Sequence, residues 1–267
     1  MEPKEGHAIP IVRARLGEGP PFSLILDTGG NNTMISEAAA QGHDIGPVIG
    51  TGKIATAFGN QRPSELVLAR ELRMGGLVLR GAPVLVHQFT SSHENHGLGA
   101  ELNVLGTPAM ACFSYIGFDY PRQRVIFSLK EPFAPPPRGS CLKVPLTVEK
   151  DGHFSVPVRF HDGKRRQVLV DTGYDGVLLL SPPLVEELGM QAHAARGVQV
   201  RAIGPGAATT GTLFVLPGME LAGCEFTDVE AWTGGTSSGT TLLGSGFLRR
   251  FRATFDFQRL ILWLEVP

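Results

Sequence analysis

The tripeptide Asp-Thr-Gly occurs twice in this chain, at residues 27–29 and 171–173. Each copy directly follows a short apolar run, residues 22–26 in the first half and 168–170 in the second. An apolar strand that ends on a carboxylate and then turns tightly through glycine holds an acid at the strand terminus. Two such sites in one chain suggest two acids that folding brings together.

The repeat extends well beyond the tripeptides. Asn103-Val104-Leu105-Gly106 corresponds to Thr241-Leu242-Leu243-Gly244, and Phe118-Asp119 corresponds to Phe255-Asp256. The offset between the halves is 144 residues at Asp27 and Asp171, 138 at the Leu-Gly pairs and 137 at the Phe-Asp pairs. Three signals in the same order indicate duplication of a unit of about half the chain, which favours two lobes.

Composition excludes several classes of protein. With 42% hydrophobic and 18% charged residues among 267, the chain is predicted to be a soluble globular protein of two modest lobes. Its net charge of −1 provides no long-range field for nucleic acid or an anionic membrane. No nucleic-acid partner is therefore expected.

Membrane insertion and export are not expected from the chain as written. No stretch reaches the ~18 apolar residues that a membrane span needs. Residues 1–6, Met-Glu-Pro-Lys-Glu-Gly, contain no apolar signal core. The expected compartment is cytoplasmic for this sequence, and periplasmic or secreted if a leader was removed, so localisation stays open.

The pattern of apolar residues predicts a mostly β fold. Most apolar runs are short and bounded by turn residues, as at 83–86 and 213–216, in a chain with 34 Gly and 20 Pro. Short helices are expected at 36–42 and 181–189 and directly after Gly106 and Gly244.

A proline cluster marks the boundary between the repeats. Pro132, Pro135, Pro136 and Pro137 stiffen an extended connection and cannot sit in a central strand. We place the N-terminal lobe at 1–131, a Pro-rich linker at 132–141 and the C-terminal lobe at 142–267.

No metal or cofactor is predicted. Cys112, Cys141 and Cys224 are too few and too scattered for a disulfide framework or a metal cluster, although one disulfide stays open. Cys112 is expected to be a small buried apolar residue. His93 and His96 have metal-capable donors but no suitable partners, and no Gly-Lys-Ser/Thr follows the glycine pairs.

Two carboxyls near one water have a defined chemistry. Hydrolysis of a peptide bond needs a base to activate water and an acid to protonate the carbonyl oxygen or the leaving amine. Because like charges close together cannot both ionise easily, one pKa rises and the pair presents one acid and one base. The alternative for Asp27 and Asp171 is a pair of Asx turns that end strands, without chemistry.

With both Asp-Thr-Gly copies and both downstream apolar-apolar-Gly segments, the chain resembles the aspartic peptidases, specifically the retropepsin-like group in a single-chain duplicated form. The resemblance implies an all-β fold with a few short helices, in two pseudo-symmetric β-barrel-like lobes of the acid protease type. It also implies that Asp27 and Asp171 are the catalytic residues. Such dyads are the standard example of the shared proton, so that behaviour is implied by the family.

The same resemblance assigns supporting roles around the two acids. Two threonines would interlock across the lobe interface, and two glycines would permit the tight turn and a close approach of substrate. Two further glycines would lie in segments that thread behind the loops. The interlocking threonines are Thr28 and Thr172, and the glycines of the tight turns are Gly29 and Gly173. The glycines behind the loops are Gly106 and Gly244.

The sequence departs from the family pattern after each tripeptide. Gly30 and Tyr174 stand where the family usually has Ala or Ser. Tyr174 would either line a specificity pocket or crowd the cleft and impair catalysis. Asp175 matches a family residue that would hold the substrate backbone; the alternative is a solvated turn residue. In the first half, Asn31 occupies the position that corresponds to Asp175.

Family members cover the cleft with a β-hairpin flap that excludes water. Glycine-rich candidates are residues 51–62 and 202–211. Phe58 at the first tip would contact substrate, or is an ordinary exposed hairpin aromatic.

These features lead to one interpretation and two alternatives. We interpret the chain as a monomeric aspartic endopeptidase, a hydrolase that cleaves a peptide or protein substrate bound in extended form. The first alternative is a catalytically impaired peptide-binding module that retains the fold, motivated by Tyr174. The second is a processing enzyme that acts only on itself or on one partner. Substrate specificity and pH optimum stay open.

Overall fold

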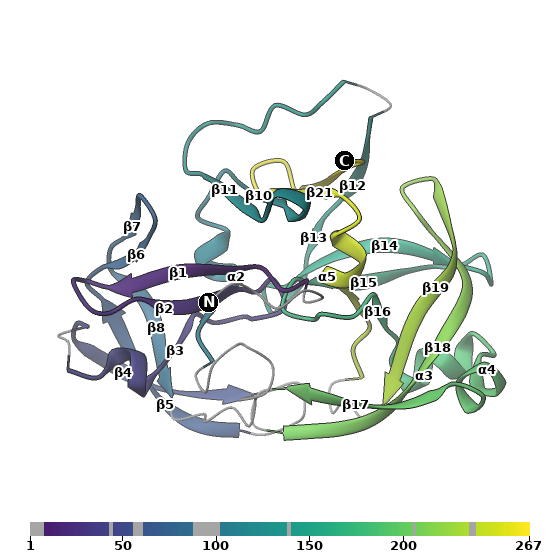
Figure 1. The fold of residues 1–267 in the computed structure, drawn as a ribbon, viewed down its shortest axis with the longest axis horizontal. Helices are drawn as coiled ribbons and strands as arrows, with labels where there is room; N and C mark the ends of the chain where they lie inside the picture. The colour runs from purple at the N-terminus through teal and green to yellow at the C-terminus, as the bar shows by residue number, and fades with distance from the viewer. Residues whose placement is uncertain are drawn as a thin grey trace.

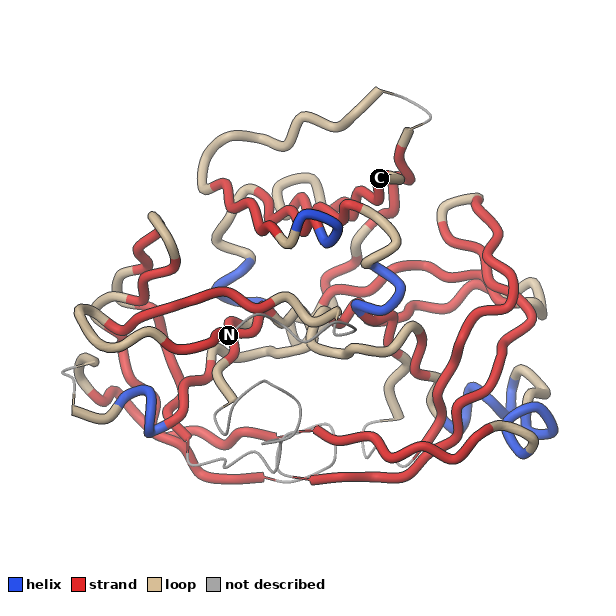
Figure 2. The backbone as a smooth tube through the Cα atoms, viewed as in Figure 1, coloured by secondary structure: helices blue, strands red, loops and turns tan. Residues whose placement is uncertain are grey.

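The structure, a computed structural model, describes residues 8–42, 45–55, 61–87, 102–137, 140–204, 207–234 and 239–267. Two β-rich lobes lie on either side of the centre, and a third, smaller sheet joins them along one side (Figure 1). Strands dominate and the helices are short (Figure 2). The predicted all-β fold with two lobes is confirmed, while the lobe boundaries at 131 and 142 stay predictions.

The first half of the chain forms one large sheet. Its strand order is β4-β5-β8-β3-β9-β2-β1-β6-β7. β2 runs parallel to β9, so that the strand before the first Asp-Thr-Gly lies beside the strand before Gly106. The bounds are β1 (Ile11–Leu16), β2 (Phe22–Leu26), β3 (Met34–Ser36), β4 (Val48–Ala55), β5 (Gln61–Ala69), β6 (Leu72–Met74), β7 (Leu77–Leu79), β8 (Ala82–His87) and β9 (Val104–Leu105).

The second half repeats this arrangement. Its sheet has the order β13-β14-β15-β20-β16-β19-β18-β17, with an additional pairing of β14 with β18. β15 runs parallel to β20, as β2 does to β9. The bounds are β13 (Thr147–Val148), β14 (Phe154–Phe160), β15 (Arg165–Asp171), β16 (Leu178–Leu179), β17 (Val198–Gly204), β18 (Ala207–Leu221), β19 (Cys224–Gly234) and β20 (Leu242–Gly244).

The third sheet contains strands from both halves, in the order β11-β10-β21-β22-β12. At its centre β10 pairs antiparallel with β21, Phe118 opposite Ala253, so that the halves share one hydrogen-bonded ladder. The bounds are β10 (Tyr115–Asp119), β11 (Arg124–Ser128), β12 (Cys141–Pro145), β21 (Arg252–Asp256) and β22 (Ile261–Glu265).

The predicted short helices are present and two further ones appear. α1 (Glu37–Ala40) begins after Ser36, whose side chain accepts a hydrogen bond from the Ala39 amide. α2 (Thr107–Met110), α3 (Pro182–Glu187) and α5 (Ser245–Leu248) lie at the other predicted places. α4 (Gln191–Ala195) and a 3-10 turn (Tyr120–Arg122) were not predicted. α4 has no capping side chain, whereas the 3-10 turn has one in Asp119, whose side chain accepts from the Arg122 amide, and that signal was overlooked.

Alternation of side chains explains the burial of the strands that lead to the acids. In β15, Val168 and Val170 are buried while Arg165 and Gln167 face outward. The apolar side of each sheet joins one core, which continues into the third sheet through Phe118 and Phe255. Their rings meet edge to face with centroids 5.7 Å apart.

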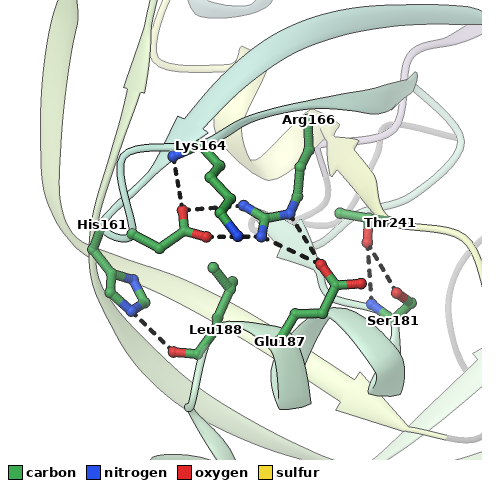
Figure 3. A network of polar contacts seen from close by, with 8 residues as sticks. His161, Lys164, Arg166, Ser181, Glu187, Leu188 and Thr241 are labelled. Atoms are coloured by element: carbon green, nitrogen blue, oxygen red, sulfur yellow. Dashed lines mark hydrogen bonds and ion pairs between the residues drawn. The ribbon is translucent and has the colours of Figure 1, made fainter.

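A polar network fixes α3 against the second lobe (Figure 3). Arg166 donates to Asp162 at 2.8 Å and to Glu187 of α3 at 3.3 Å. At the other end of the helix, the Ser181 amide donates to Thr241 Oγ1 at 3.2 Å. Because Thr241 directly precedes β20, these bonds hold α3 beside the strand that supports the second acid.

The expectation for Cys112 is wrong. Its side chain is exposed, because Met110 and Phe113 occupy the inward positions of this turn. Cys141 and Cys224 are also free thiols, so no disulfide links the three cysteines.

The two lobes meet at the threonines of the repeated tripeptide. The Thr28 amide donates to Thr172 Oγ1 and the Thr172 amide donates to Thr28 Oγ1, both at 3.0 Å. Each hydroxyl in turn donates to a carbonyl oxygen of the opposite lobe, Thr28 to Val170 and Thr172 to Leu26, both at 2.6 Å. Both threonines are 0% exposed. This reciprocal set makes the two loops one unit.

Replacing Thr28 or Thr172 by valine should destabilise the protein. Valine keeps the shape but leaves a buried amide and a buried carbonyl without partners, which costs roughly 2 kcal/mol or more. Urea unfolding of each valine variant measures this loss. The matched control is serine, which keeps the hydroxyl and should lose clearly less; equal losses in the valine and serine variants would contradict the hydrogen-bond account.

Candidate active site

Each acid of the repeated tripeptide is placed at the end of a buried parallel strand. Asp27 follows β2 directly and its amide donates to the Leu105 carbonyl at 3.0 Å. Asp171 is the last residue of β15 and pairs with Gly244 of β20. Neighbouring parallel strands therefore fix the backbone of each acid on both halves of the molecule.

The two carboxyl groups cross over to the opposite loop. A Cβ atom on Gly29 would lie 2.3 Å from Cγ of Asp171, and one on Gly173 would lie 2.6 Å from Cγ of Asp27. Any side chain at either position would overlap a carboxyl group. Glycine after each Asp-Thr is thus what lets the acids approach one another, and a hydrogen bond joins the two carboxyl groups.

Backbone amides orient both carboxyl groups. Asp27 Oδ1 accepts from the Gly29 amide at 2.7 Å. Asp171 Oδ1 accepts from the amides of Gly173 at 2.8 Å and Tyr174 at 3.0 Å. These bonds leave the remaining carboxyl oxygens to face each other or a ligand.

Burial and mutual repulsion raise the pKa of the pair. Removal from water is the largest cause that raises the pKa of Asp27 and that of Asp171, and the pKa of Asp171 lies well above its ordinary value. The neighbouring Asp27 charge raises the pKa of Asp171 further, whereas the hydrogen bond from Asp171 lowers that of Asp27. Both shifts favour a pair in which one of the two carboxyls carries a proton. Both side chains keep partial exposure, which a water molecule needs to reach them.

Gly106 and Gly244 lie directly behind the two loops. A Cβ on Gly106 would lie 2.3 Å from the Asn32 carbonyl oxygen, and one on Gly244 would lie 2.2 Å from that of Gly176. The residue after each of these glycines forms a hydrogen bond to the loop. The Thr107 amide donates to the Gly30 carbonyl oxygen at 2.7 Å, and the Ser245 amide donates to the Tyr174 carbonyl oxygen at 2.8 Å.

The position after each Asp-Thr-Gly differs between the halves. Gly30 lies beside Asp27, since a Cβ there would approach Asp27 Oδ2 to 3.1 Å. The ring of Tyr174 instead folds back over its own loop: Cβ atoms on Gly244 and Gly176 would meet its Cδ1 at 2.5 Å and its hydroxyl oxygen at 2.2 Å. Burial, and then the charge of Glu230, raises the pKa of Tyr174, so the phenol stays neutral.

Asp175 binds the backbone of the opposite half of the chain. Its Oδ1 accepts from the Ala8 amide at 2.6 Å. Asp175 therefore binds a main-chain amide, as expected of a residue that holds a substrate backbone, but the amide it binds here is that of Ala8.

His153 is part of the site and was missed from the sequence. Its Nε2 donates to the Gly29 carbonyl at 2.9 Å, across the lobe interface. Its Nδ1 lies 2.9 Å from the Asp151 carboxylate, and a positive charge on the ring lowers the pKa of Asp27. A signal existed: acid-Gly-His occurs at residues 5–7 and again at 151–153. His7 lies outside the described residues.

The flap candidates are long strand pairs. β4 pairs antiparallel with β5, and β17 with β18, and in Figure 1 the free ends of the two pairs point toward one another from opposite lobes. Residues 56–60, which include Phe58, and residues 205–206 lie outside the described residues.

Across the described ranges, no group of three or more His, Cys, Asp or Glu is placed to hold a metal ion. Nor does any helix in those ranges have the length and apolar character to cross a membrane.

Comparison with known proteins places these features in a family. The model of the family described as aspartyl protease matches residues 12–109 and 156–247, one segment in each half and together more than half of the chain. A crystal structure of a retropepsin-like aspartic protease from Rickettsia conorii is similar to 47% of this chain and 92% of its own, at 20% identity and a TM-score of 0.39. Comparison with curated protein sequences gave no match.

The two matched segments contain both Asp-Thr-Gly tripeptides and both downstream Leu-Gly pairs. The resemblance inferred from these motifs is therefore confirmed, and the chain belongs to the aspartyl protease family.

Proposed function

We propose that this chain is an aspartic endopeptidase that hydrolyses peptide bonds with a water molecule activated between Asp27 and Asp171. The observation that carries the proposal is the crossed pair: each carboxyl lies against the glycine of the other loop, and burial raises the pKa of both. Membership of the aspartyl protease family supports the reaction type.

The two acids have different roles in this mechanism. Asp27 acts as the base, because the hydrogen bond from Asp171 and the nearby His153 both favour its charged form. It takes a proton from water as the oxygen attacks the substrate carbonyl carbon, while Asp171 gives its proton to the carbonyl oxygen. When the tetrahedral intermediate collapses, Asp27 protonates the leaving amine and the intermediate returns a proton to Asp171.

The rigid loops supply preorganisation. The threonine bonds across the interface and the amides that bind each carboxyl fix the acids before substrate arrives. Less reorganisation is then needed when charge moves in the transition state. We propose that the substrate lies extended between the two strand-pair flaps and that one chain suffices, since it contains both acids.

Tyr174 favours a second candidate, a peptide-binding module without catalysis. Its ring lies over Gly176 and Gly244 and its amide binds the Asp171 carboxylate, so it occupies space beside the dyad. Binding of a statine-type transition-state mimic, combined with no cleavage of any peptide in a library, would favour this candidate.

Asp27→Asn and Asp171→Asn should each abolish proteolysis. Either change removes one proton-transfer group, which is worth about 10²- to 10⁴-fold in rate. Cleavage of a peptide library, profiled from acid to neutral pH, measures the loss. Asp228→Asn is the matched control, because Asp228 is exposed and Asn tolerates its φ of 51°. Full activity in both dyad variants would refute the assignment.

Asp171→Asn should stabilise the protein at neutral pH. Since the folded pKa of Asp171 lies well above its ordinary 3.8, its contribution to stability is complete below that ordinary value and is lost as pH rises through the folded pKa. Neutral Asn avoids this loss. Urea unfolding should show the variant more stable than wild type at pH 7 and equal near pH 3. A variant that is less stable at pH 7 would contradict the raised pKa.

His153 should act on the dyad through both its donor and its charge. His153→Gln keeps an N–H donor for the Gly29 carbonyl and should retain kcat within about threefold, whereas His153→Phe should lower it about tenfold or more. Both variants lose the positive charge that lowers the pKa of Asp27, so the acid limb of the kcat/KM profile should move to higher pH. Unchanged profiles in both variants would leave His153 without this role.

A further inference from the structure

The third sheet has two equivalent halves with one strand unmatched. β10 and β11 form a hairpin in which Phe118 faces Val125, and β21 and β22 form the same hairpin with Phe255 facing Leu262. On its outer side β22 pairs with β12, Leu142 opposite Leu264 and Val144 opposite Leu262. No strand of the described residues pairs with the outer side of β11, which is therefore an edge of the sheet.

Burial differs accordingly at equivalent positions. Leu262 and Leu264, which β12 covers, are each 0% exposed. Their equivalents Val125 and Phe127 are only partly buried, and Leu129 beyond them is 50% exposed. β11 thus has the apolar residues that would pack against a neighbouring strand, but no described strand takes the place beside it that β12 takes beside β22.

An open groove of about 640 Å³ lies at this face. Val125 and Phe127 form one wall, and Val12 of β1 and Met74 of β6 contribute to the other. The equivalents of Val12 and Met74 in the second half are Val156 and Leu221, by the registers of β1 with β6 and of β14 with β18. There the corresponding space is filled, because β12 packs between β22 and β14.

We propose that this groove is a second peptide-binding site, separate from the dyad, which accepts an extended segment of another polypeptide as a sixth strand beside β11. The occupant is defined by β12, whose Leu142 and Val144 point toward the core at alternate positions. It is a segment with apolar residues at alternate positions. Backbone N–H and C=O groups on the outer side of β11, which no described strand pairs, supply affinity, and the groove selects for the apolar side chains.

A labelled peptide with the sequence of residues 141–146, with serine in place of Cys141, tests the site. The protein used is Asp27→Asn, so that binding does not depend on catalysis and no peptide is consumed. Fluorescence anisotropy should show saturable binding with a Kd of about 10 to 100 μM. The control peptide has aspartate at the positions of Leu142 and Val144 and should not bind.

Variants of β11 test whether the peptide binds in the groove. Phe127→Glu and Leu129→Glu put a charge against the bound apolar residues and should weaken binding at least about tenfold. Leu129 is exposed, so its variant tests the site even if Phe127→Glu unfolds. The matched control is Ile126→Glu, because Ile126 is 43% exposed on the opposite face of the strand and its variant should bind as before.

Four results with the peptide would overturn the proposal. They are the absence of saturable binding, equal binding of the aspartate peptide, equal loss in Ile126→Glu, and displacement of the peptide by a statine-type inhibitor, which would place it at the dyad. A concentration-dependent dimer without peptide that is lost in Phe127→Glu and Leu129→Glu would assign the groove to a second copy and also overturn it. Each result is independent of whether the chain is a protease.

Discussion

The structure depends on the exchange of hydrogen bonds between Thr28 and Thr172. These side chains are buried, bond to one another's amides and reach a carbonyl of the opposite lobe. Because unpaired buried polar groups are costly, the four bonds permit essentially one relative placement of the loops. That placement brings two carboxyl groups together in spite of their repulsion. The hydrogen bonds of the interface thus offset the free-energy cost of holding the two acids close to each other.

Two carboxyls that face each other are equivalent by position but not by surroundings. His153 bonds to the Gly29 loop beside Asp27, whereas Asp171 is flanked by the neutral ring of Tyr174. A duplicated fold thus supplies an approximately symmetric frame, and the residues that differ between its halves give the two acids different surroundings, which is the basis for the base and acid roles that we propose. The same divergence leaves the outer side of β11 without a partner among the described strands, whereas the outer side of β22 pairs with β12.

Much of this architecture could be predicted, because the duplication is written in local motifs. The Asp-Thr-Gly tripeptides, the Leu-Gly pairs and the short apolar runs predicted two mostly β lobes with short helices at α1, α2, α3 and α5. Contacts between distant residues could not be predicted in the same way. His153 bonds to Gly29, 124 residues away, and nothing local in either segment indicates the partner. Cys112 was placed wrongly because apolar character alone does not say which side of a short helix faces the core.

The central claim is that Asp27 and Asp171 share one proton. Carbon-13 NMR of the aspartate carboxyl groups, followed from acid to neutral pH in wild type and in the Asp27→Asn variant, measures it directly. The account predicts that in wild type one carboxyl stays protonated well above the ordinary range, and that the apparent pKa of Asp171 falls once the Asp27 charge is removed. Two carboxyls that titrate independently near their ordinary values, with no response of Asp171 to the variant, would contradict it.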